Sequence, residues 1–438
     1  MDQRFIDADT KNFSLIFFAF VVGIVVGVIS SIFRLSLAYI EMLRDSLYTG
    51  EGHLGLSNWI LPFLFAVGGI GIALLLVKRF APEASGSGVH EIEGALDEIR
   101  PLRWKRVLPV KFFASLFSLG SGLLLGREGP TVQIGANIGK MIKDLFRRPD
   151  NKTNPLVSAG AAAGLASAFN APLSGIIFVI EEMQEHFRWS FFSVAAIMVA
   201  SGTADFVVRV LVDADPVIKM MVFPDPALSA IWLFIILGAL FGFVGQIFNQ
   251  LLIVSLDYFA SLSQKKTVLS LITAGLLISV IGILNPAMLG GGYTAIRQVL
   301  DLSHTQQFLI GLFLIRLFLT LFSYGLGVPG GIFAPLLALG VIFGTLYGNI
   351  MQPYFPALIP YPGVFAVAGM AGIFASTVRA PLTGLVLAIE MTSNFELILP
   401  LIITSVTASL VTAQLGNRPV YTILLERTMS IKKSAQGR

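Results

Sequence analysis

The sequence predicts an all-α polytopic membrane protein, and three observations carry this prediction. Of the 438 residues, 55% are hydrophobic and only 13% are charged, about half of the charged share of a soluble domain. Asp, Glu, Lys and Arg are absent from four long segments, 153–180, 227–256, 267–296 and 317–378. Each segment is long enough for one or more crossings, because a span needs ~20 apolar residues. The apolar runs are continuous, whereas the strands of a membrane β-barrel alternate polar and apolar residues.

The first apolar stretch and the basic clusters predict the topology. Residues 13–33 are too long for a signal-peptide core and lack a small-residue cleavage site, so we expect a retained first helix. Basic clusters favour the cytoplasmic side of a membrane. They lie at 103–106, 147–152, 265–266 and 427–433. We therefore expect a single transmembrane domain over residues 1–438, with both termini and a short tail (426–438) in the cytoplasm.

Composition also disfavours several classes of function. The chain has no cysteine, which excludes disulfides and thiolate metal sites, and we predict no other metal or cofactor. The net charge of +4 suits Lys and Arg beside a membrane, and no soluble basic domain is present to bind nucleic acid. We expect no enzyme. An intramembrane serine hydrolase using Ser87 with His90 or His186 is awkward, because Ser87 and His90 share one turn and no supporting acid is apparent.

The sequence repeats itself. At an offset of 205 residues, basic, aromatic, glycine and proline positions coincide in order, among them Lys111 with Arg316, Phe117 with Phe322, Gly126 with Gly331 and Pro130 with Pro335. Residues 171–175 similarly match 380–384. Any glycine-rich membrane protein aligns with itself somewhere, but this ordered coincidence favours two homologous repeats, which we place at 13–212 and 226–425. Matching residues do not distinguish parallel from inverted repeats.

Each repeat contains Gly-x-x-x-Pro at a corresponding position, 126–130 and 331–335. Glycine lets the backbone approach a bound ion closely, and proline suits the first turn of a helix. The free amides of that turn and the positive end of the helix dipole favour an anion. Two such helix starts could converge on one anion at mid-membrane. The alternative for either motif alone is ordinary breaking of a helix by glycine and proline.

A third glycine-rich turn, 86–89, precedes the acidic residues Glu91 and Glu93. The hydroxyl of Ser87 could donate to an anion. The alternative is that it caps the following helix.

Four motifs together resemble the signature set of the CLC family of chloride channels and antiporters. They are Gly86-Ser87-Gly88-Val89, Gly126-Arg127-Glu128-Gly129-Pro130, Gly331-Ile332-Phe333-Ala334-Pro335 and Arg418-Pro419-Val420-Tyr421. The four lie in the family's order, and the resemblance covers nearly the whole chain. It implies two inverted repeats of many tilted, partly spanning helices, assembled as a homodimer in a plasma membrane, here the bacterial inner membrane.

The resemblance also implies roles for individual residues. Ser87 and Tyr421 would donate hydroxyls to a central chloride, and the amides of Ile332 and Phe333 would complete its shell. The other anion-binding residues that the two motifs would supply are Gly126, Arg127, Gly129 and Gly331. Glu128 would be the external gate: its carboxylate occupies a place built for an anion, and protonation removes it. Chloride and protons are then the substrates, exchanged by an antiporter.

Glu181 and Glu182 end an apolar helix. Carboxylates at such depth are costly and often belong to proton paths, although two solvated acids at a helix end are an equal alternative. In the family's antiporters the second glutamate relays internal protons, which is Glu182 here. Passive channel members typically lack that acid. A voltage- or pH-gated chloride channel is therefore the alternative function, and Glu182 favours the antiporter.

One residue departs from the family pattern, because His90 stands where the family usually has proline. A tolerated substitution at a helix start is the simpler interpretation, and pH-dependent anion entry through its imidazole is the sharper one. A fluoride-specialised relative is a further alternative, disfavoured because Ser87 and Tyr421 match the chloride pattern.

Overall fold

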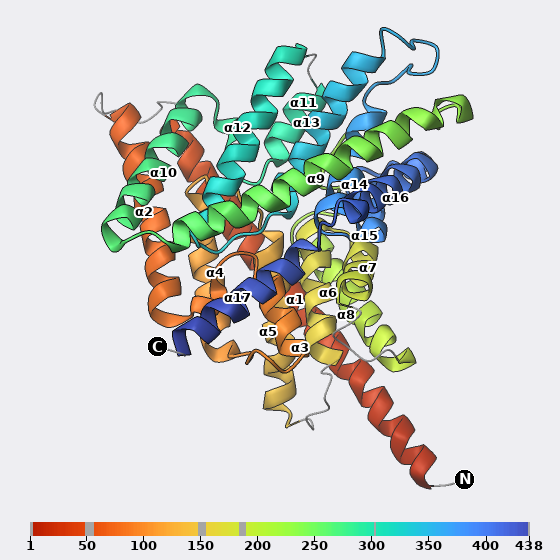
Figure 1. The fold of residues 1–438 in the computed structure, drawn as a ribbon. Coiled ribbons are helices and arrows are strands. Elements are labelled where there is room, and N and C mark those ends of the chain that lie inside the picture. Colours follow the sequence, from red (N-terminus) through yellow and green to blue (C-terminus); the bar gives the residue numbers. More distant parts are fainter. Residues whose placement is uncertain (1–2, 49–56, 148–154, 184–189, 302–303, 437–438) are drawn as a thin grey trace.

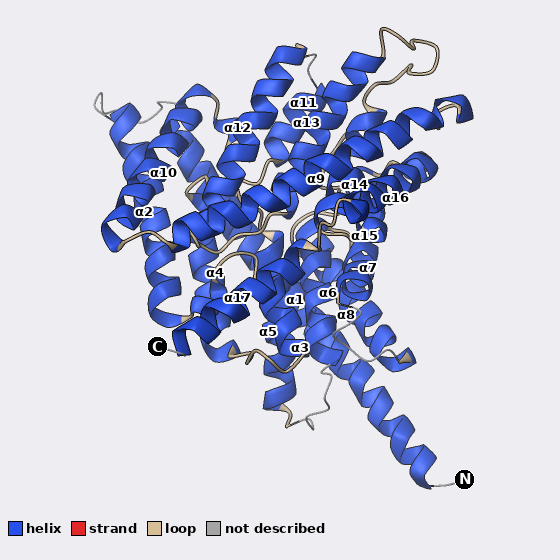
Figure 2. Ribbon diagram, in the orientation of Figure 1, coloured by secondary structure: helices blue, strands red, loops and turns tan. Residues whose placement is uncertain are grey.

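The computed structural model describes residues 3–48, 57–147, 155–183, 190–301 and 304–436. Over these residues the fold is helical, with two isolated β-bridges and no strand (Figure 2). Eight of the described helices are long and apolar enough to cross a membrane. These are α1, α2, α8, α9, α10, α12, α13 and α16. The predicted all-α polytopic fold is thus confirmed, and the expected first helix lies within the longer helix α1.

The α-helices within the described residues form two series of eight in the same order, followed by one more. The first series is α1 (Gln3–Tyr48), α2 (Ser57–Phe80), α3 (Val89–Leu96), α4 (Trp104–Gly120), α5 (Glu128–Leu145), α6 (Pro155–Phe169), α7 (Pro172–Glu182) and α8 (Phe191–Leu211). The second series is α9 (Ile231–Ala260), α10 (Gln264–Leu284), α11 (Tyr293–Asp301), α12 (Gln306–Gly325), α13 (Phe333–Met351), α14 (Val364–Thr377), α15 (Pro381–Thr392) and α16 (Ile398–Gln414). The last helix, α17 (Val420–Gln436), crosses the predicted limit of the second repeat at residue 425.

The two series meet at an antiparallel bridge between Gly126 and Gly331. The amide of each glycine donates to the carbonyl of the other, at 2.8 and 2.7 Å. Because each residue pairs with its own repeat equivalent, the bridge lies on the axis that relates the two series. From this bridge α5 runs toward the lower edge of the molecule and α13 toward the upper edge (Figure 1). The repeats are therefore inverted, as the resemblance implied.

A second pair of contacts follows the same symmetry. Glu181 of α7 accepts hydrogen bonds from the amide and hydroxyl of Thr383, at 2.7 and 2.8 Å, at the start of α15. Glu390 of α15 accepts the equivalent bonds from Ser174 of α7, at 2.7 and 2.6 Å. Each carboxylate accepts hydrogen bonds from free amides at the start of the partner helix. Its negative charge also interacts favourably with the positive end of that helix dipole. Glu181 is thus a helix cap for the other repeat, and the alternative of a solvated acid does not apply to it.

Small residues let helices of each repeat pack backbone to backbone. A side chain at Gly135 of α5 would collide with the carbonyl oxygen of Gly160 of α6. In the second repeat, a side chain at Gly340 of α13 would collide with the carbonyl oxygen of Gly369 of α14. Such close approach is the usual way in which membrane helices gain packing energy without a hydrophobic driving force.

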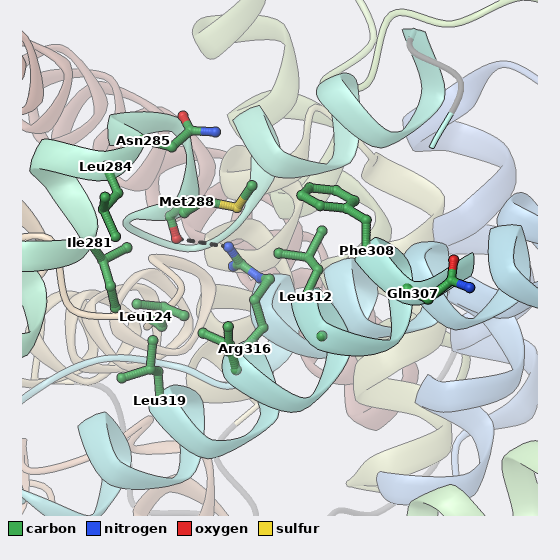
Figure 3. A pocket seen from close by; sticks show the side chains of 12 residues that line it. Leu124, Ile281, Leu284, Asn285, Met288, Gln307, Phe308, Leu312, Arg316 and Leu319 are labelled. Atoms are coloured by element: carbon green, nitrogen blue, oxygen red, sulfur yellow. Dashed lines mark hydrogen bonds between the residues drawn. The ribbon is translucent and has the colours of Figure 1, made fainter. Parts of the chain in front are cut away.

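Two buried cations fix the turns that precede the short helices α3 and α11. The Lys111 ammonium donates to the carbonyl of Gly86, at 2.7 Å. Its repeat equivalent, Arg316, donates to the carbonyl of Met288 at 3.0 Å (Figure 3). It also donates to the carbonyl of Gly290, at 3.4 Å. Both side chains are fully buried, and neither has an ion-pair partner among the described residues. Carbonyl dipoles therefore replace their hydration, and the two turns are held rigidly.

Candidate functional site

The starts of α5 and α13 converge at the central bridge. Arg127 and Ile332 are the N-cap residues of these helices, and neither side chain caps its helix. A side chain at Gly331 would lie 2.9 Å from the backbone nitrogen of Gly129 in the first turn of α5. Free amides of two helix starts therefore face the same small volume, as the paired motifs predicted, and this arrangement favours an anion.

The Glu128 carboxylate reaches from the first residue of α5 to the start of α13. Its side chain is fully buried. One oxygen, Oε2, accepts from the amide of Ala334 at 3.4 Å, and the other, Oε1, accepts from the hydroxyl of Tyr293. The carboxylate thus occupies the place between two helix starts where an anion would bind.

Arg127 makes contacts away from this carboxylate, although it is the adjacent residue. Its guanidinium donates to the carbonyl of Ala168 at the end of α6, at 3.2 Å. It also lies over the ring of Tyr293, 5.2 Å from the ring centre. No ion pair joins Arg127 to Glu128 in the part of the chain that the structure describes. The cation stabilises the C-terminal end of α6 and leaves Glu128 to the Ala334 amide and the Tyr293 hydroxyl.

Ser87 lies in a turn that only glycines on both sides permit, since Gly86 and Gly88 have φ of 60° and 84°. Its side chain is fully buried and lies against Gly129. The amide of Val89 donates to Ser87 Oγ at 3.3 Å, which is a local capping bond. That bond uses a lone pair of the oxygen, and the hydroxyls of Tyr324 and Tyr421 also face the Ser87 side chain.

Tyr421 and Phe333 form the other wall of the site. Their rings meet edge to face, with centres 5.8 Å apart, and the ring of Phe333 also packs on Phe178 and Phe374. Tyr421 is fully buried, yet its hydroxyl has no hydrogen-bond partner among the described residues. A buried unpartnered hydroxyl is rare in proteins. Ile332, one residue earlier, is also fully buried.

Glu182 is the last residue of α7 and interacts electrostatically with Glu93 of α3 and with Glu181. Glu93 is buried, and neither of its carboxylate oxygens has a hydrogen-bond partner among the residues described. Glu93 lies in the middle of α3, and neither carboxylate has an ion-pair partner in the described chain. In the sequence, Glu93 is marked only as an acid near a predicted helix start.

The histidines do not support the hydrolase alternative. His90 is buried, its Nδ1 has no partner among the described residues, and its Nε2 lies 4.0 Å from a carboxylate oxygen of Glu91. Ser87 Oγ instead accepts from the backbone. His186 lies outside the described residues.

Two tyrosines of the site were missed from the sequence. Tyr324 accepts a hydrogen bond from the amide of Ser87, at 3.3 Å, and Tyr293 donates to Glu128. A signal for Tyr293 was present, because the repeat offset places it opposite Gly88 in the glycine-rich turn.

A comparison with protein-family models decides the family. The model described as voltage gated chloride channel matches residues 68–413, most of the chain. The chain belongs to this family.

Curated relatives of this family member carry a transporter's name. The H(+)/Cl(-) exchange transporter ClcA of Vibrio parahaemolyticus serotype O3:K6 is 45% identical, covering 99% of this chain and 94% of the relative. The protein of the same name from Salmonella paratyphi A is 41% identical, covering 99% and 93%.

Solved structures of the family share its fold. A slow cyanobacterial Cl-/H+ antiporter superposes with a TM-score of 0.91 at 38% identity, covering 95% of this chain and 98% of that one. A CLC-type fluoride/proton antiporter superposes with a TM-score of 0.73 at 21% identity, covering 91% and 95%, and this match shows the fold alone.

Proposed function

We propose that this protein exchanges chloride for protons across a membrane, with the Glu128 carboxylate as the gate. The observation that carries the proposal is the carboxylate held by Ala334 between two convergent helix starts. A carboxylate in a place suited to anions competes with chloride. Protonation removes its charge and its affinity for the amides, so one side chain links proton binding to chloride entry.

The central chloride would lie between Ser87, Tyr421 and the amides of Ile332 and Phe333. The hydroxyls of Tyr421 and Ser87 are both buried and face each other, which supports this assignment, because an anion beside them would accept from both. Partial charges of amides and hydroxyls hold an anion without a full cation, which favours rapid release. The glycines at 126, 129 and 331 would leave room for it in the path beside Arg127.

Glu182 would relay protons from the other side of the membrane. Its electrostatic interaction with Glu93 supports this role. Glu93 is a buried carboxylate without a hydrogen-bond donor among the described residues, and such a group is costly when ionised. A proton held there lowers that cost. We include Glu93 in the proposed relay, although it was not among the residues chosen from the sequence.

The names of the relatives favour exchange over the alternative, a passive voltage- or pH-gated chloride channel. We further propose a multi-pass location in a bacterial inner membrane, with both termini in the cytoplasm, and a homodimer in the lipid bilayer. The basic C-terminal segment 427–433 supports the orientation. No resident cofactor is proposed.

Flux measurements on reconstituted protein test the proposal. Purified wild type in liposomes should move protons uphill when a chloride gradient is imposed, recorded with chloride and proton electrodes together. Glu128→Ala and Glu182→Gln should each keep chloride flux and lose proton flux. Glu426→Gln is the matched control, since this exposed acid pairs with Arg418 and with no other cation among the described residues. A chloride reversal potential indifferent to the proton gradient would establish a channel instead.

A further inference from the structure

The geometry points to Tyr293 as a positioning residue for the gate: its hydroxyl latches the Glu128 carboxylate in the anion path and sets the external pH at which the gate opens. This inference rests on the proposed function, because it takes Glu128 as the gate.

The latch is visible in the two bonds of the carboxylate. Oε2 accepts from the amide of Ala334 on α13, and Oε1 accepts from the hydroxyl of Tyr293 on α11. The two donors come from different helices and hold one oxygen each. Loss of either donor leaves the carboxylate freer to leave the path, since a hydrogen bond to a charged group is stronger than one to a neutral group.

Tyr293 is itself held in place by its own turn. It is the first residue of α11 and follows Gly292, whose φ of 108° is a left-handed conformation. A side chain at Gly292 would collide with the guanidinium of Arg316. That buried guanidinium donates to the carbonyl of Met288 (Figure 3) and also to that of Gly290. The tyrosine therefore cannot follow the carboxylate when the gate moves.

A polar cavity of about 400 Å³ adjoins the turn. Glu41, Arg44 and Asp45 of α1 line it, together with residues 285–287 and 289–294. Water in this cavity would reach Tyr293, and the proton that releases the gate would have a route to the bond between Tyr293 and Glu128.

The charged groups around the gate come from the start of α5 and from α1. Arg127 on α5 lies over the Tyr293 ring, and α1 contributes Arg34 and Glu41. Arg34 donates to the side chain of Asn170 at 2.5 Å, and this bond fixes the position of its guanidinium. Tyr293 is the group among them that donates a hydrogen bond to the carboxylate.

The strength of this hydrogen bond in the two protonation states of Glu128 predicts the direction of the pH shift. A phenol donates strongly to a carboxylate and weakly to a neutral carboxylic acid. Tyr293 therefore stabilises the blocking, charged form of Glu128 and contributes little once the gate is protonated. Without the hydroxyl, the gate should open at higher external pH. Coupling should persist, because Glu128 remains.

The test is the external-pH profile of chloride and proton flux in liposomes containing full-length Tyr293→Phe. We expect the pH of half-maximal transport to move by about one unit to the alkaline side, which corresponds to ~1.4 kcal/mol. Tyr347→Phe is the matched control, since that buried hydroxyl donates only to the carbonyl of Leu233, at 2.9 Å. Its profile should match wild type.

Two further variants separate the outcomes. A monofluorinated tyrosine at position 293 has nearly the same size and a stronger hydrogen-bond donor, so the pH profile should move to the acid side. This variant keeps the test valid in case Tyr293→Phe folds poorly. In a Glu128→Gln background, Tyr293→Phe should change nothing further. An unmoved profile in both Tyr293 variants, or an equal shift in the Gln background, overturns the latch. Proton coupling that survives in Glu128→Gln alone overturns the proposed gate itself.

Discussion

Replacing Glu390 with glutamine should make the protein easier to unfold. The carboxylate accepts from the amide and hydroxyl of Ser174 through Oε2, and from the amide of Leu173 through Oε1, at 2.6 to 3.1 Å. All three donors lie in the first turn of α7, in the other repeat. Glutamine has the same shape but offers one acceptor oxygen and one donor group, so at least one of these donors loses its partner.

The size of the effect follows from these bonds. A hydrogen bond to a charged group contributes ~1.5–3 kcal/mol, and the loss of negative charge at a helix N-terminus costs ~0.3–1 kcal/mol more. We therefore expect Glu390→Gln to lower the free energy of unfolding by about 2–4 kcal/mol. The same substitution at Glu426, which is 57% exposed and paired with Arg418, should cost less than ~1 kcal/mol.

Titration of the protein with SDS in mixed micelles, followed by circular dichroism, measures the free energy of unfolding for both variants. Parallel flux assays would show whether the folded fraction still transports. Equal unfolding free energies for Glu390→Gln and wild type would refute the reasoning. They would mean that the carboxylate is hydrated in the membrane-embedded protein and that the inter-repeat bonds contribute nothing.

Three further predictions concern packing and the anion site. Gly135→Ala should sharply reduce the yield of folded protein, because its methyl collides with a backbone carbonyl, whereas Gly68→Ala, with nothing within 4 Å, should be neutral in the same size-exclusion assay. Tyr421→Phe should weaken chloride binding several-fold in calorimetry yet leave the unfolding free energy unchanged, since that hydroxyl has no partner among the described residues. Lys111→Met should weaken chloride binding, because the lost ammonium no longer holds the carbonyl of Gly86 in the turn before Ser87. Wild-type affinity in the same calorimetric assay would contradict this.

The fold was largely predictable from the sequence, because lipid constrains composition so strongly. Charge-free segments indicated spans, and coincident positions such as Lys111 and Arg316 indicated a repeat whose members play equivalent parts in the structure. The inversion came only from the resemblance. Identical residues at an offset carry no direction, whereas the bridge between Gly126 and Gly331 does.

The helix starts of the candidate site could be predicted, because their glycines and prolines mark the backbone. The side chains that reach the site from distant helices could be predicted less well. Glycine and proline at 126–130 and 331–335 mark helix starts in any sequence. Tyr293 and Glu93 carry no local mark of function, because their importance depends on contacts across more than 80 residues of chain. Glu181 looked like a candidate proton carrier, but its bonds to Thr383 use it as a cap.

The exchange of caps between Glu181 and Glu390 has a consequence for how such a chain came to exist. Helices α7 and α15 each carry, near the C-terminal end, a carboxylate that accepts from the free amides at the N-terminal end of the other helix. A protein of one repeat could satisfy both only by pairing with a second copy inserted the opposite way up. The present chain therefore has the bonding pattern of a dual-topology dimer whose two members were later joined end to end. Separately expressed halves, 1–225 and 226–438, should accordingly recover each other when co-inserted.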